Sequence, residues 1–293
     1  MENGHLPGVR QVRYLPPPSA GFGVEVLGFD RLRAMDPGHG RGALQRPDFH
    51  VLALVRSGAG RHTADFVDHA LRERSVVWVR PGVVHRWTDA EGVDGPLILF
   101  EQDFLAGTGI AVEAAQDPFA PTTWRLDEAR WELGLRAADH LGHEHAMSVA
   151  RPALASPPVL AHLLAALVLR TLPPEPAPRA GTAAGDRTVF RRYRAAVEEQ
   201  FAHRHRVADY ARGLGYSPRT LARAVRAATG IGAKQFLDQR LLLEARRLLA
   251  YTDLPVARCA ERLGFEDAAN FTTFFQRQSG SPPSRWRAGH GDR

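Results

Sequence analysis

A pattern of small and apolar residues occurs twice between Val207 and Gly280, and this repeat narrows the folds open to the chain more than any other feature. In each copy a short amphipathic run ends in leucine, glycine and an aromatic residue, and a second run then ends at another glycine. This arrangement predicts two helices joined by a tight turn, which is a helix-turn-helix. The matched residues are Ala211, Leu214, Gly215, Tyr216, Leu221, Val225 and Gly230 in the first copy and Ala260, Leu263, Gly264, Phe265, Phe271, Phe275 and Gly280 in the second.

Glycine and proline predict where the helices of each copy end and begin. Gly215 and Gly264 are expected to close the first helices, because a residue with positive φ costs least when it has no Cβ. In the first copy, Ser217 and Pro218 are expected to start the second helix. The serine hydroxyl can cap free N–H groups, and proline fits the first helical position.

The second helix of each copy is expected to turn one face to the core and the other to solvent. Leu221, Val225 and Ala228 recur at helical spacing and are predicted to face inward. The opposite face of the first copy is rich in arginine, whose guanidinium bonds guanine O6 and N7 together or clamps phosphate. The same face of the second copy is nearly uncharged, so we expect it to bind DNA more weakly. The predicted DNA-binding residues are Ser217, Arg219, Thr220, Ala222, Arg223 and Arg226 in the first copy and Asp267, Ala268, Ala269, Asn270, Thr272, Thr273 and Gln276 in the second.

The part of the chain from about Val207 to Arg287 resembles the DNA-binding domain of the AraC/XylS family of bacterial transcription regulators. The family usually carries a basic residue at the position of Thr273 and often an aliphatic residue at that of Cys259. The first difference weakens the base reading expected of the second motif, and the second is expected to change only packing. The matching residues are the run 214–223, then Arg240, Leu241, Ala245, Arg246, Leu248 and Leu249, and finally Ala260, Gly264, Phe265, Asn270, Phe271, Phe274, Phe275, Gly280, Ser281, Pro282 and Arg287.

The resemblance implies how the two motifs cooperate. In the family a long helix holds both recognition helices on one face of DNA, where they enter successive major grooves. Residues 233–250 contain no Gly or Pro and are expected to form this helix, with a length of roughly 27 Å against about 34 Å for one DNA turn. Promoter DNA, a small-molecule effector and RNA polymerase are the partners that the resemblance implies.

Charge is distributed unevenly along the chain. From Asp186 onward there are 20 Lys and Arg against 11 Asp and Glu, a net charge of +9, whereas the preceding residues carry −3. A basic part of this kind is expected to displace counterions from DNA phosphates. No apolar run approaches the roughly 20 residues of a membrane span, and the first residues lack a secretion signal. The single cysteine, Cys259, is expected in the core and has no second thiol to pair with, and together these features predict a cytoplasmic protein.

The order of the sequence patterns predicts an α+β protein of two domains. A small cupin-like β-barrel is expected over residues 1–125, and two helices at about 126–145 and 156–172 complete a helical segment over 126–172. Residues 173–185 have a proline-rich half and an Ala/Gly-rich half and are expected to form a linker. Asp186 is expected to cap the first helix of an all-α DNA-binding domain over residues 186–293, which carries both helix-turn-helix motifs.

Short apolar runs separated by Gly and Pro predict the strands of the barrel, at 24–32, 49–55, 61–66, 76–79, 84–88 and 97–100. The segment 80–85 resembles the second half of the cupin signature, and the domain resembles the effector-sensing barrels that precede AraC-type motifs. A metal-binding cupin has a His-x-His pair that His50, His62 and His69 do not provide, so no metal and no cofactor are predicted.

An effector pocket in the barrel is expected to combine apolar walls with a few polar groups. Tryptophans would stack on a ligand, while arginine and histidines would hydrogen-bond to it. The same side chains have an alternative role, the tryptophans in the core and the histidines exposed or bonded locally. The candidate effector-binding residues are Arg46, His50, His62, Trp78, His85 and Trp87.

The helical segment that follows the barrel has a broad apolar stripe formed by Leu160, Leu163, Leu164, Leu167 and Val168. This stripe either docks on the barrel or supplies contacts in a homodimer.

The sequence as a whole predicts a sequence-specific transcription regulator controlled by an effector, and not an enzyme. Two alternatives remain open: a metal-dependent cupin enzyme with a DNA-binding tail, and an architectural DNA binder whose barrel only dimerises. Stoichiometric iron, manganese or zinc in the purified protein would favour the enzyme. A DNA affinity that no small molecule changes would favour the architectural protein.

Overall fold

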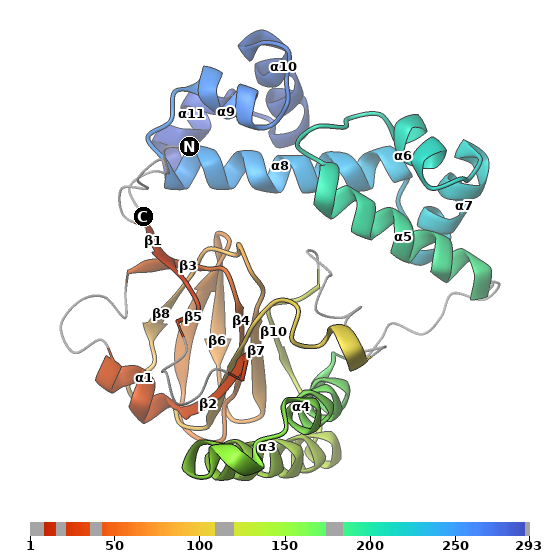
Figure 1. The fold of residues 1–293 in the computed structure, drawn as a ribbon. Coiled ribbons are helices and arrows are strands. Elements are labelled where there is room, and N and C mark those ends of the chain that lie inside the picture. Colours follow the sequence, from red (N-terminus) through yellow and green to blue (C-terminus); the bar gives the residue numbers. More distant parts are fainter. Residues whose placement is uncertain (1–8, 16–21, 36–42, 109–119, 174–183, 291–293) are drawn as a thin grey trace. The chain divides into compact units, whose positions relative to one another are not determined.

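The structure is a computed structural model that describes residues 9–15, 22–35, 43–108, 120–173 and 184–290 (Figure 1). The chain divides into two compact units. The N-terminal unit is Gly8–Glu175, and the C-terminal unit contains Pro176–Arg293. The segment that the sequence predicts as a linker, 173–185, lies mostly outside the described residues.

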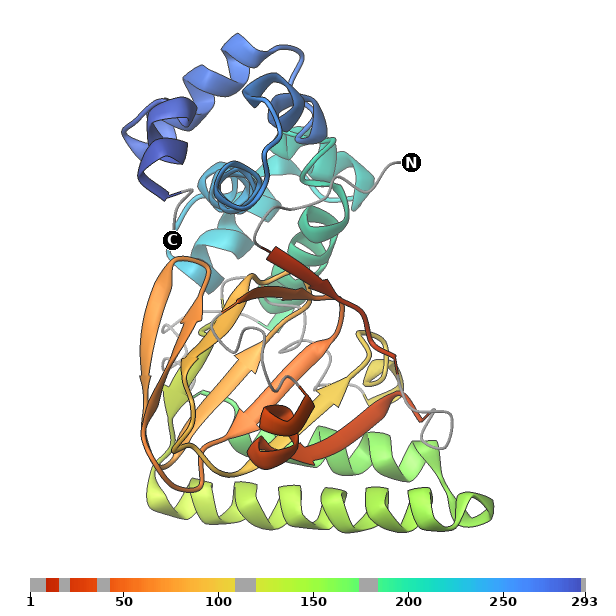
Figure 2. The same cartoon turned by 90° about the vertical axis from the view of Figure 1, so that its left-hand side faces the viewer.

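Two five-stranded sheets form the β part of the N-terminal unit (Figures 1 and 2). All neighbouring strands in both sheets run antiparallel except the pair β1 and β3. The first sheet has the order β1 (Val9–Val12), β3 (Leu44–Pro47), β8 (His85–Asp89), β5 (Gly60–Ala64) and β6 (Val67–Leu71). The second has the order β10 (Thr123–Arg125), β7 (Ser75–Val79), β4 (His50–Leu54), β9 (Pro96–Phe100) and β2 (Val24–Gly28).

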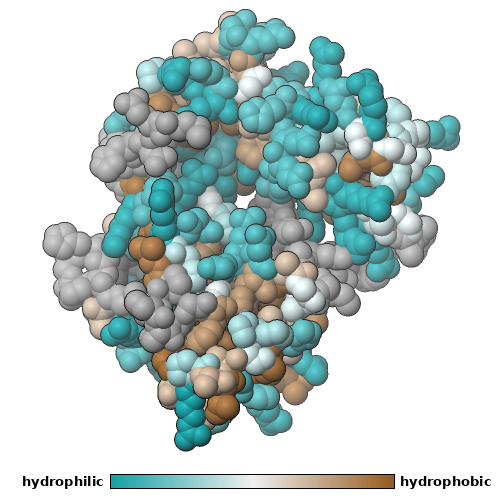
Figure 3. Space-filling view, in the orientation of Figure 1, coloured by the Kyte–Doolittle hydropathy of each residue, from teal (hydrophilic) through white to brown (hydrophobic). Residues whose placement is uncertain are grey.

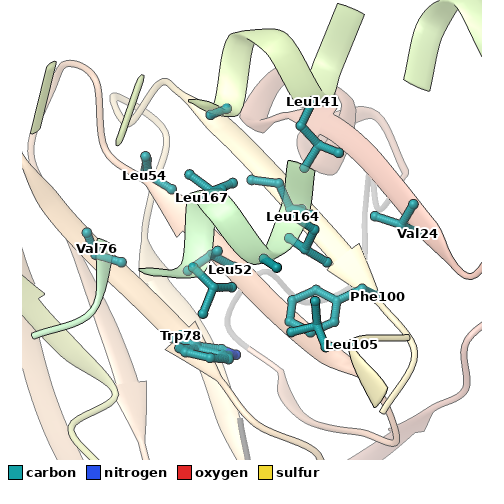
Figure 4. Close-up of a cluster of buried hydrophobic side chains, with 14 of the residues drawn as sticks. Val24, Leu52, Leu54, Val76, Trp78, Phe100, Leu105, Leu141, Leu164 and Leu167 are labelled. Atoms are coloured by element: carbon teal, nitrogen blue, oxygen red, sulfur yellow. The ribbon is translucent and has the colours of Figure 1, made fainter. Parts of the chain in front are cut away.

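Alternation along the strands divides the apolar residues of this unit into two cores. One core lies between the sheets, because residues of both contribute to it, such as Val77 of β7 and Trp87 of β8. The other lies on the outer face of the second sheet, where the helices α3 (Glu128–Ala150) and α4 (Pro157–Thr171) cover Leu52 and Trp78. Figure 4 shows Leu164 and Leu167 of α4 directed onto this face. Strands β4 and β7 are buried at every residue and largely apolar, as expected for strands covered on both faces.

The predicted helices of the N-terminal unit are present, and one predicted strand is partly wrong. The run 24–32 is a strand only as far as Gly28, and Phe29–Met35 forms the helix α1. The ring of Phe29 is buried against Trp87 in the core between the sheets, with centroids 5.2 Å apart. Tertiary packing therefore makes the end of this run helical, although its apolar character alone suggested a strand. Two short 3-10 turns, Ala106–Thr108 and Pro152–Leu154, complete the unit.

The C-terminal unit is all helical. Helix α8 is seen along its length in Figure 1 and end-on in Figure 2, with one helix-turn-helix toward each end. Its 19 residues give a length of about 28 Å, as the sequence predicts. The helices are α5 (Ala184–Gln200), α6 (Val207–Gly213), α7 (Pro218–Thr229), α8 (Ala233–Tyr251), α9 (Val256–Arg262), α10 (Ala268–Ser279) and α11 (Pro283–His290).

The predicted turn and cap chemistry of the motifs is confirmed. Gly215 and Gly264 have φ of +73° and +70° and lie between the two helices of their motifs. The Ser217 hydroxyl accepts a hydrogen bond from the backbone N–H of Thr220 at 3.1 Å, with Pro218 at the first helical position.

Two expectations for the C-terminal unit are wrong. Ala228 is exposed, and Ala224 is buried with Leu221 and Val225 instead, because the buried stripe of α7 is narrow and follows spacings of three and four. Asp186 does not cap α5, since the helix begins at Ala184 and Asp186 lies in its first turn.

The second motif also contacts the segment that leads into the first motif. The connection between α5 and α6 reaches the turn of the second motif, where His205 Nε2 lies 2.8 Å from the carbonyl oxygen of Leu263. The His205 ring packs on Phe265 with centroids 4.8 Å apart. Gly264 lies so close to Ala202 that a Cβ there would overlap its carbonyl oxygen. Helix α8 is therefore not the only connection that fixes the second motif relative to the first.

We expect Gly264→Ala to destabilise the second motif more than Gly215→Ala destabilises the first. Both substitutions place a side chain at positive φ, which costs roughly 1–2 kcal/mol, but a Cβ at Gly215 meets nothing within 4 Å. The overlap with Ala202 adds about 1–3 kcal/mol. Native-state hydrogen exchange in peptides from α6–α7 and α9–α10 measures both losses. Equal losses would mean that the loop around Ala202 moves aside at no cost.

Candidate DNA-binding face and effector site

The exposed face of α7 carries the arginines predicted to contact DNA. Arg219, Arg223 and Arg226 are exposed together with Ala222, while the opposite face packs on the core formed with α5, α6 and α8. Ser217 and Thr220 lie at the N-terminal end of this face, where their hydroxyl oxygens are 2.9 Å apart. The visible surface of the C-terminal unit is largely hydrophilic (Figure 3). The face can therefore offer several guanidinium groups to DNA without exposing its core.

One of these arginines is held by a buried acid. Nε and Nη2 of Arg223 donate to Oδ1 of Asp186 at 3.2 and 3.1 Å. Asp186 belongs to the first turn of α5, so the ion pair joins α5 to the recognition helix. Sequence reasoning missed this contact, because a residue expected to cap its own helix gives no sign of a partner 37 positions away.

The predicted DNA-contact positions within α10 carry uncharged side chains, and the exposed Arg277 lies in the last turn of the helix. Ala269, Asn270, Thr273 and Gln276 are exposed. Ala268 is partly buried, as is Thr272, whose hydroxyl donates to the carbonyl oxygen of Ala268 at 2.7 Å.

Asp267, also predicted to contact DNA, is the N-cap of α10. Its carboxylate accepts from the backbone N–H of Asn270 at 2.7 Å and from the Asn270 side-chain amide at 3.3 Å. An N-cap is where a carboxylate stabilises a helix. The side chain of Asp267 thus has a structural function at this position.

Charged residues connect α8 to α5 and to the second motif. The buried guanidinium of Arg240 donates to Glu198 of α5 at 2.9 Å, contacts Glu244 at 3.3 Å and stacks on the Phe201 ring at 3.9 Å. Burial raises the pKa of Glu198, and the charge of Arg240 opposes that shift. Toward α10, the Asp238 carboxylate accepts from the Gln278 amide at 3.3 Å. These paired groups explain how a helix buried by two motifs tolerates charges along its length.

Three of the candidate effector residues meet between the sheets. His62 and His85 are buried with 3.1 Å between His62 Nε2 and His85 Nδ1, and the Trp87 ring lies 4.6 Å from that of His62. Burial lowers the pKa of His85 to about 4. Burial also lowers the pKa of His62, and the neighbouring His85 and His69 add to that shift. His62 Nδ1 has no hydrogen-bond partner among the described residues, so it remains available to a polar ligand.

The other candidates do not join this group. His50 and Trp78 lie on the outer face of the second sheet, where Trp78 Nε1 donates to His50 Nδ1 at 3.2 Å and the His50 ring stacks on Phe100 at 4.6 Å. Burial lowers the pKa of His50 to about 3, and the nearby charge of Arg80 adds to the shift. Arg46 is on β3, one position along from Gln45, which pairs with His85, so strand alternation turns it away from the interior. A single pocket lined by all six residues is therefore not what the fold provides.

Two further properties concern the described ranges alone. They contain no group of three His, Cys, Asp or Glu side chains arranged to hold a metal ion. None of their helices combines the length and the hydropathy that crossing a membrane requires.

A β-rich unit with flanking helices, followed by two helix-turn-helix motifs on one long helix, defines a two-domain transcription regulator. Models of known families agree with both halves. An AraC-like ligand binding domain matches residues 26–138, and a helix-turn-helix domain matches residues 210–289. Together these matches span about two thirds of the chain. The chain belongs to the AraC family of transcription regulators.

Individual relatives extend over most of the chain. The HTH-type transcriptional activator RhaS of Salmonella schwarzengrund is 28% identical over 253 residues, which cover 83% of this chain and 86% of RhaS. Among solved structures, ToxT from Vibrio cholerae O395 is 12% identical and covers 85% of this chain and 92% of ToxT, with a TM-score of 0.40. The DNA-binding domain of AdpA in complex with a target DNA is 34% identical, with coverages of 32% and 85% and a TM-score of 0.30.

We expect the buried histidines to make the N-terminal unit less stable as the pH falls from about 6.5 to about 4. The folded pKa of His85 is about 4, below the unfolded value near 6.5, so the unfolded chain alone takes up a proton in this window. The free energy of unfolding then decreases by up to about 1.4 kcal/mol per pH unit for each such group.

His85→Gln removes one titrating ring, and it should flatten the pH dependence while the exposed His143→Gln leaves it unchanged. Urea unfolding can be followed by tryptophan fluorescence, since Trp78, Trp87, Trp124 and Trp131 all belong to this unit. The same slope in His85→Gln as in the wild type would contradict the assignment of His85 as a neutral buried ring.

Proposed function

We propose that this protein is a transcription regulator whose promoter binding or activation is controlled by a small molecule bound in the N-terminal unit. One observation carries the DNA-binding part: two exposed recognition helices, α7 and α10, belong to motifs held in a fixed arrangement by α8 and by the contact of His205 with Leu263. A length of about 28 Å for α8 is close to one turn of DNA and suits two successive major grooves.

The two motifs are proposed to contribute unequally. Helix α7 presents Arg219, Arg223 and Arg226, which can bond bases or phosphates. Helix α10 presents Ala269, Asn270, Thr273 and Gln276, with no cation among these four residues. We therefore assign the stronger half of the operator to α7 and a weaker, hydrogen-bonding half to α10.

The effector is proposed to bind between the two sheets, beside His62, His85 and Trp87. The free Nδ1 of His62 supports this position, because a buried nitrogen without a partner gains most from a ligand that bonds to it. The two histidines are neutral at pH 7, so they favour a ligand that offers hydroxyl or carbonyl groups over a cation. His50 and Trp78 are excluded from this proposal because their hydrogen bond and stacking partners lie on the other face of the sheet.

Relatives named as transcriptional activators suggest that DNA binding is followed by recruitment of RNA polymerase, and we extend this to the present chain. Such a function requires access to promoter DNA, which in a bacterium lies in the cytoplasm. Exposed apolar side chains on α3 and α4, namely Leu133, Met147, Val159 and Leu169, support a homodimer formed through these helices.

We expect Arg223→Ala to weaken sequence discrimination at one half of the operator, and Thr273→Ala to have a smaller effect at the other half. Loss of a bidentate arginine–base contact costs about 1–3 kcal/mol. Operators can be selected from a randomised duplex library with the full-length protein, and dissociation constants then measured over a range of salt. Wild-type affinity should fall steeply as salt rises. Equal losses for the two variants would contradict the ranking, and a library without enriched sequences would contradict specific DNA binding.

We expect an effector to raise the melting temperature of the N-terminal unit and to change operator affinity or promoter output, since regulation requires unequal affinity for two states. A thermal-shift screen of small metabolites identifies candidates. His62→Gln should abolish the response to the effector, whereas the matched variant His50→Gln on the outer face should keep it. The opposite pattern would move the effector site to the side covered by α3 and α4.

A further inference from the structure

The two side chains of the Asp186–Arg223 ion pair differ greatly in solvent exposure. The side chain of Arg223 is 67% exposed, whereas that of Asp186 is only 10% exposed. The buried carboxylate belongs to the first turn of α5 and is fixed by the helix, while the guanidinium extends from the outer face of α7. The ion pair thus holds one edge of the Arg223 guanidinium, on a predicted DNA-binding face where the side chain would otherwise be flexible.

The geometry leaves part of the guanidinium available. Nε and Nη2 share the acceptor Oδ1 of Asp186, which uses two of the five N–H donors of arginine. Both hydrogens on Nη1 and one on Nη2 remain, and one from each nitrogen lies parallel to the other along the outer edge of the planar group. Two parallel donors on one edge are what guanine O6 and N7 accept in the major groove.

The charge of the ion pair also favours a base contact over a phosphate contact for Arg223. A carboxylate next to an arginine opposes the attraction to phosphate, so a residue needed only as a phosphate clamp gains nothing from it. Directed hydrogen bonds to a base benefit instead, because the side chain is already ordered before DNA arrives. Arg219 and Arg226, on the same face, make no ion pair within the described part of the chain, which suits the less directional contacts of phosphate binding.

We propose that Asp186 is a positioning residue for base recognition, which orients Arg223 so that its outer edge reads a guanine. This inference rests on the proposed function, because it assumes that the outer face of α7 contacts DNA. It assigns base reading to Arg223 in particular, and it makes a residue outside both helix-turn-helix motifs a determinant of operator sequence.

Asp186→Asn tests the proposal in the full-length protein, with operators selected by the wild type from a randomised duplex library. The measured quantity is the ratio of affinities for the selected operator and for single base-pair substitutions of it. A bidentate contact gives roughly 5- to 150-fold discrimination. We expect Asp186→Asn to reduce this affinity ratio at least about fivefold at one G·C pair. Its affinity for random DNA should be unchanged or higher.

Three comparisons decide the outcome. Asp209→Asn is the matched control, since Asp209 pairs with Arg212 on α6 and its loss changes the charge equally; discrimination should be unchanged. In an Arg223→Ala background, Asp186→Asn should cause no further loss, which separates orientation of Arg223 from a general effect on folding. Asp186→Ser replaces Asp186→Asn if the latter does not fold, because serine is accepted near helix N-termini.

Two results would overturn the inference. One is a uniform rise in affinity for all sequences with discrimination intact, which would reduce Asp186 to an acid that repels phosphate. The other is an equal loss with and without Arg223. If the wild type enriches no sequence at all, the proposed function itself fails, so the two failures are distinguishable.

Discussion

Helix α8 is the element on which the C-terminal unit depends, because both helix-turn-helix motifs complete their cores against it. A helix-turn-helix of two short helices buries too little apolar surface to be stable alone. Twelve of the 19 residues of α8 are buried, including Asp238, Arg240 and Arg247. Arg240 and Asp238 are accommodated because α5 and α10 supply their partners Glu198 and Gln278, and Arg247 pairs with Glu244 of α8 itself. Recognition helices on the outside of this unit are therefore positioned by interactions on its inside.

The two motifs share one backbone design but use different chemistry at the start of their second helices. A serine hydroxyl caps α7, whereas the Asp267 carboxylate caps α10. Both caps stabilise a helix, but a carboxylate also places negative charge where a phosphate would approach. The arginines of α7 and the uncharged Ala269, Asn270, Thr273 and Gln276 of α10 extend this difference along the predicted contact faces. The N-cap residues of α7 and α10 thus differ in charge in the same sense as the predicted contact faces of these helices.

Much of the C-terminal unit could be predicted from the sequence, because glycines, caps and helical spacing are local signals. The Leu-Gly-aromatic turns at Gly215 and Gly264 and the length of α8 are examples. What could not be predicted depends on residues distant in sequence. Asp186 was expected to act on its own helix and instead reaches α7.

The N-terminal unit shows the same limit on prediction. The strand pattern was readable, but the grouping of candidate effector residues was not, since it depends on which face of which sheet each strand presents. His50 and His62 are both buried histidines on strands, yet they belong to different cores. Strand alternation alone places His50 with Leu52 and Leu54, but only the packing in the structure shows that α3 and α4 cover that side.

The close approach of Gly264 to Ala202 has a consequence for the DNA that this protein can use. Because the turn of the second motif rests on the connection between α5 and α6, which leads into the first motif, the separation of α7 and α10 is fixed by the fold. One additional base pair between two recognition sites moves the second by about 3.4 Å and turns it by roughly 35° around the duplex. A fixed pair of reading helices cannot follow that rotation. Operators for this protein can therefore diverge in base sequence much more freely than in spacing.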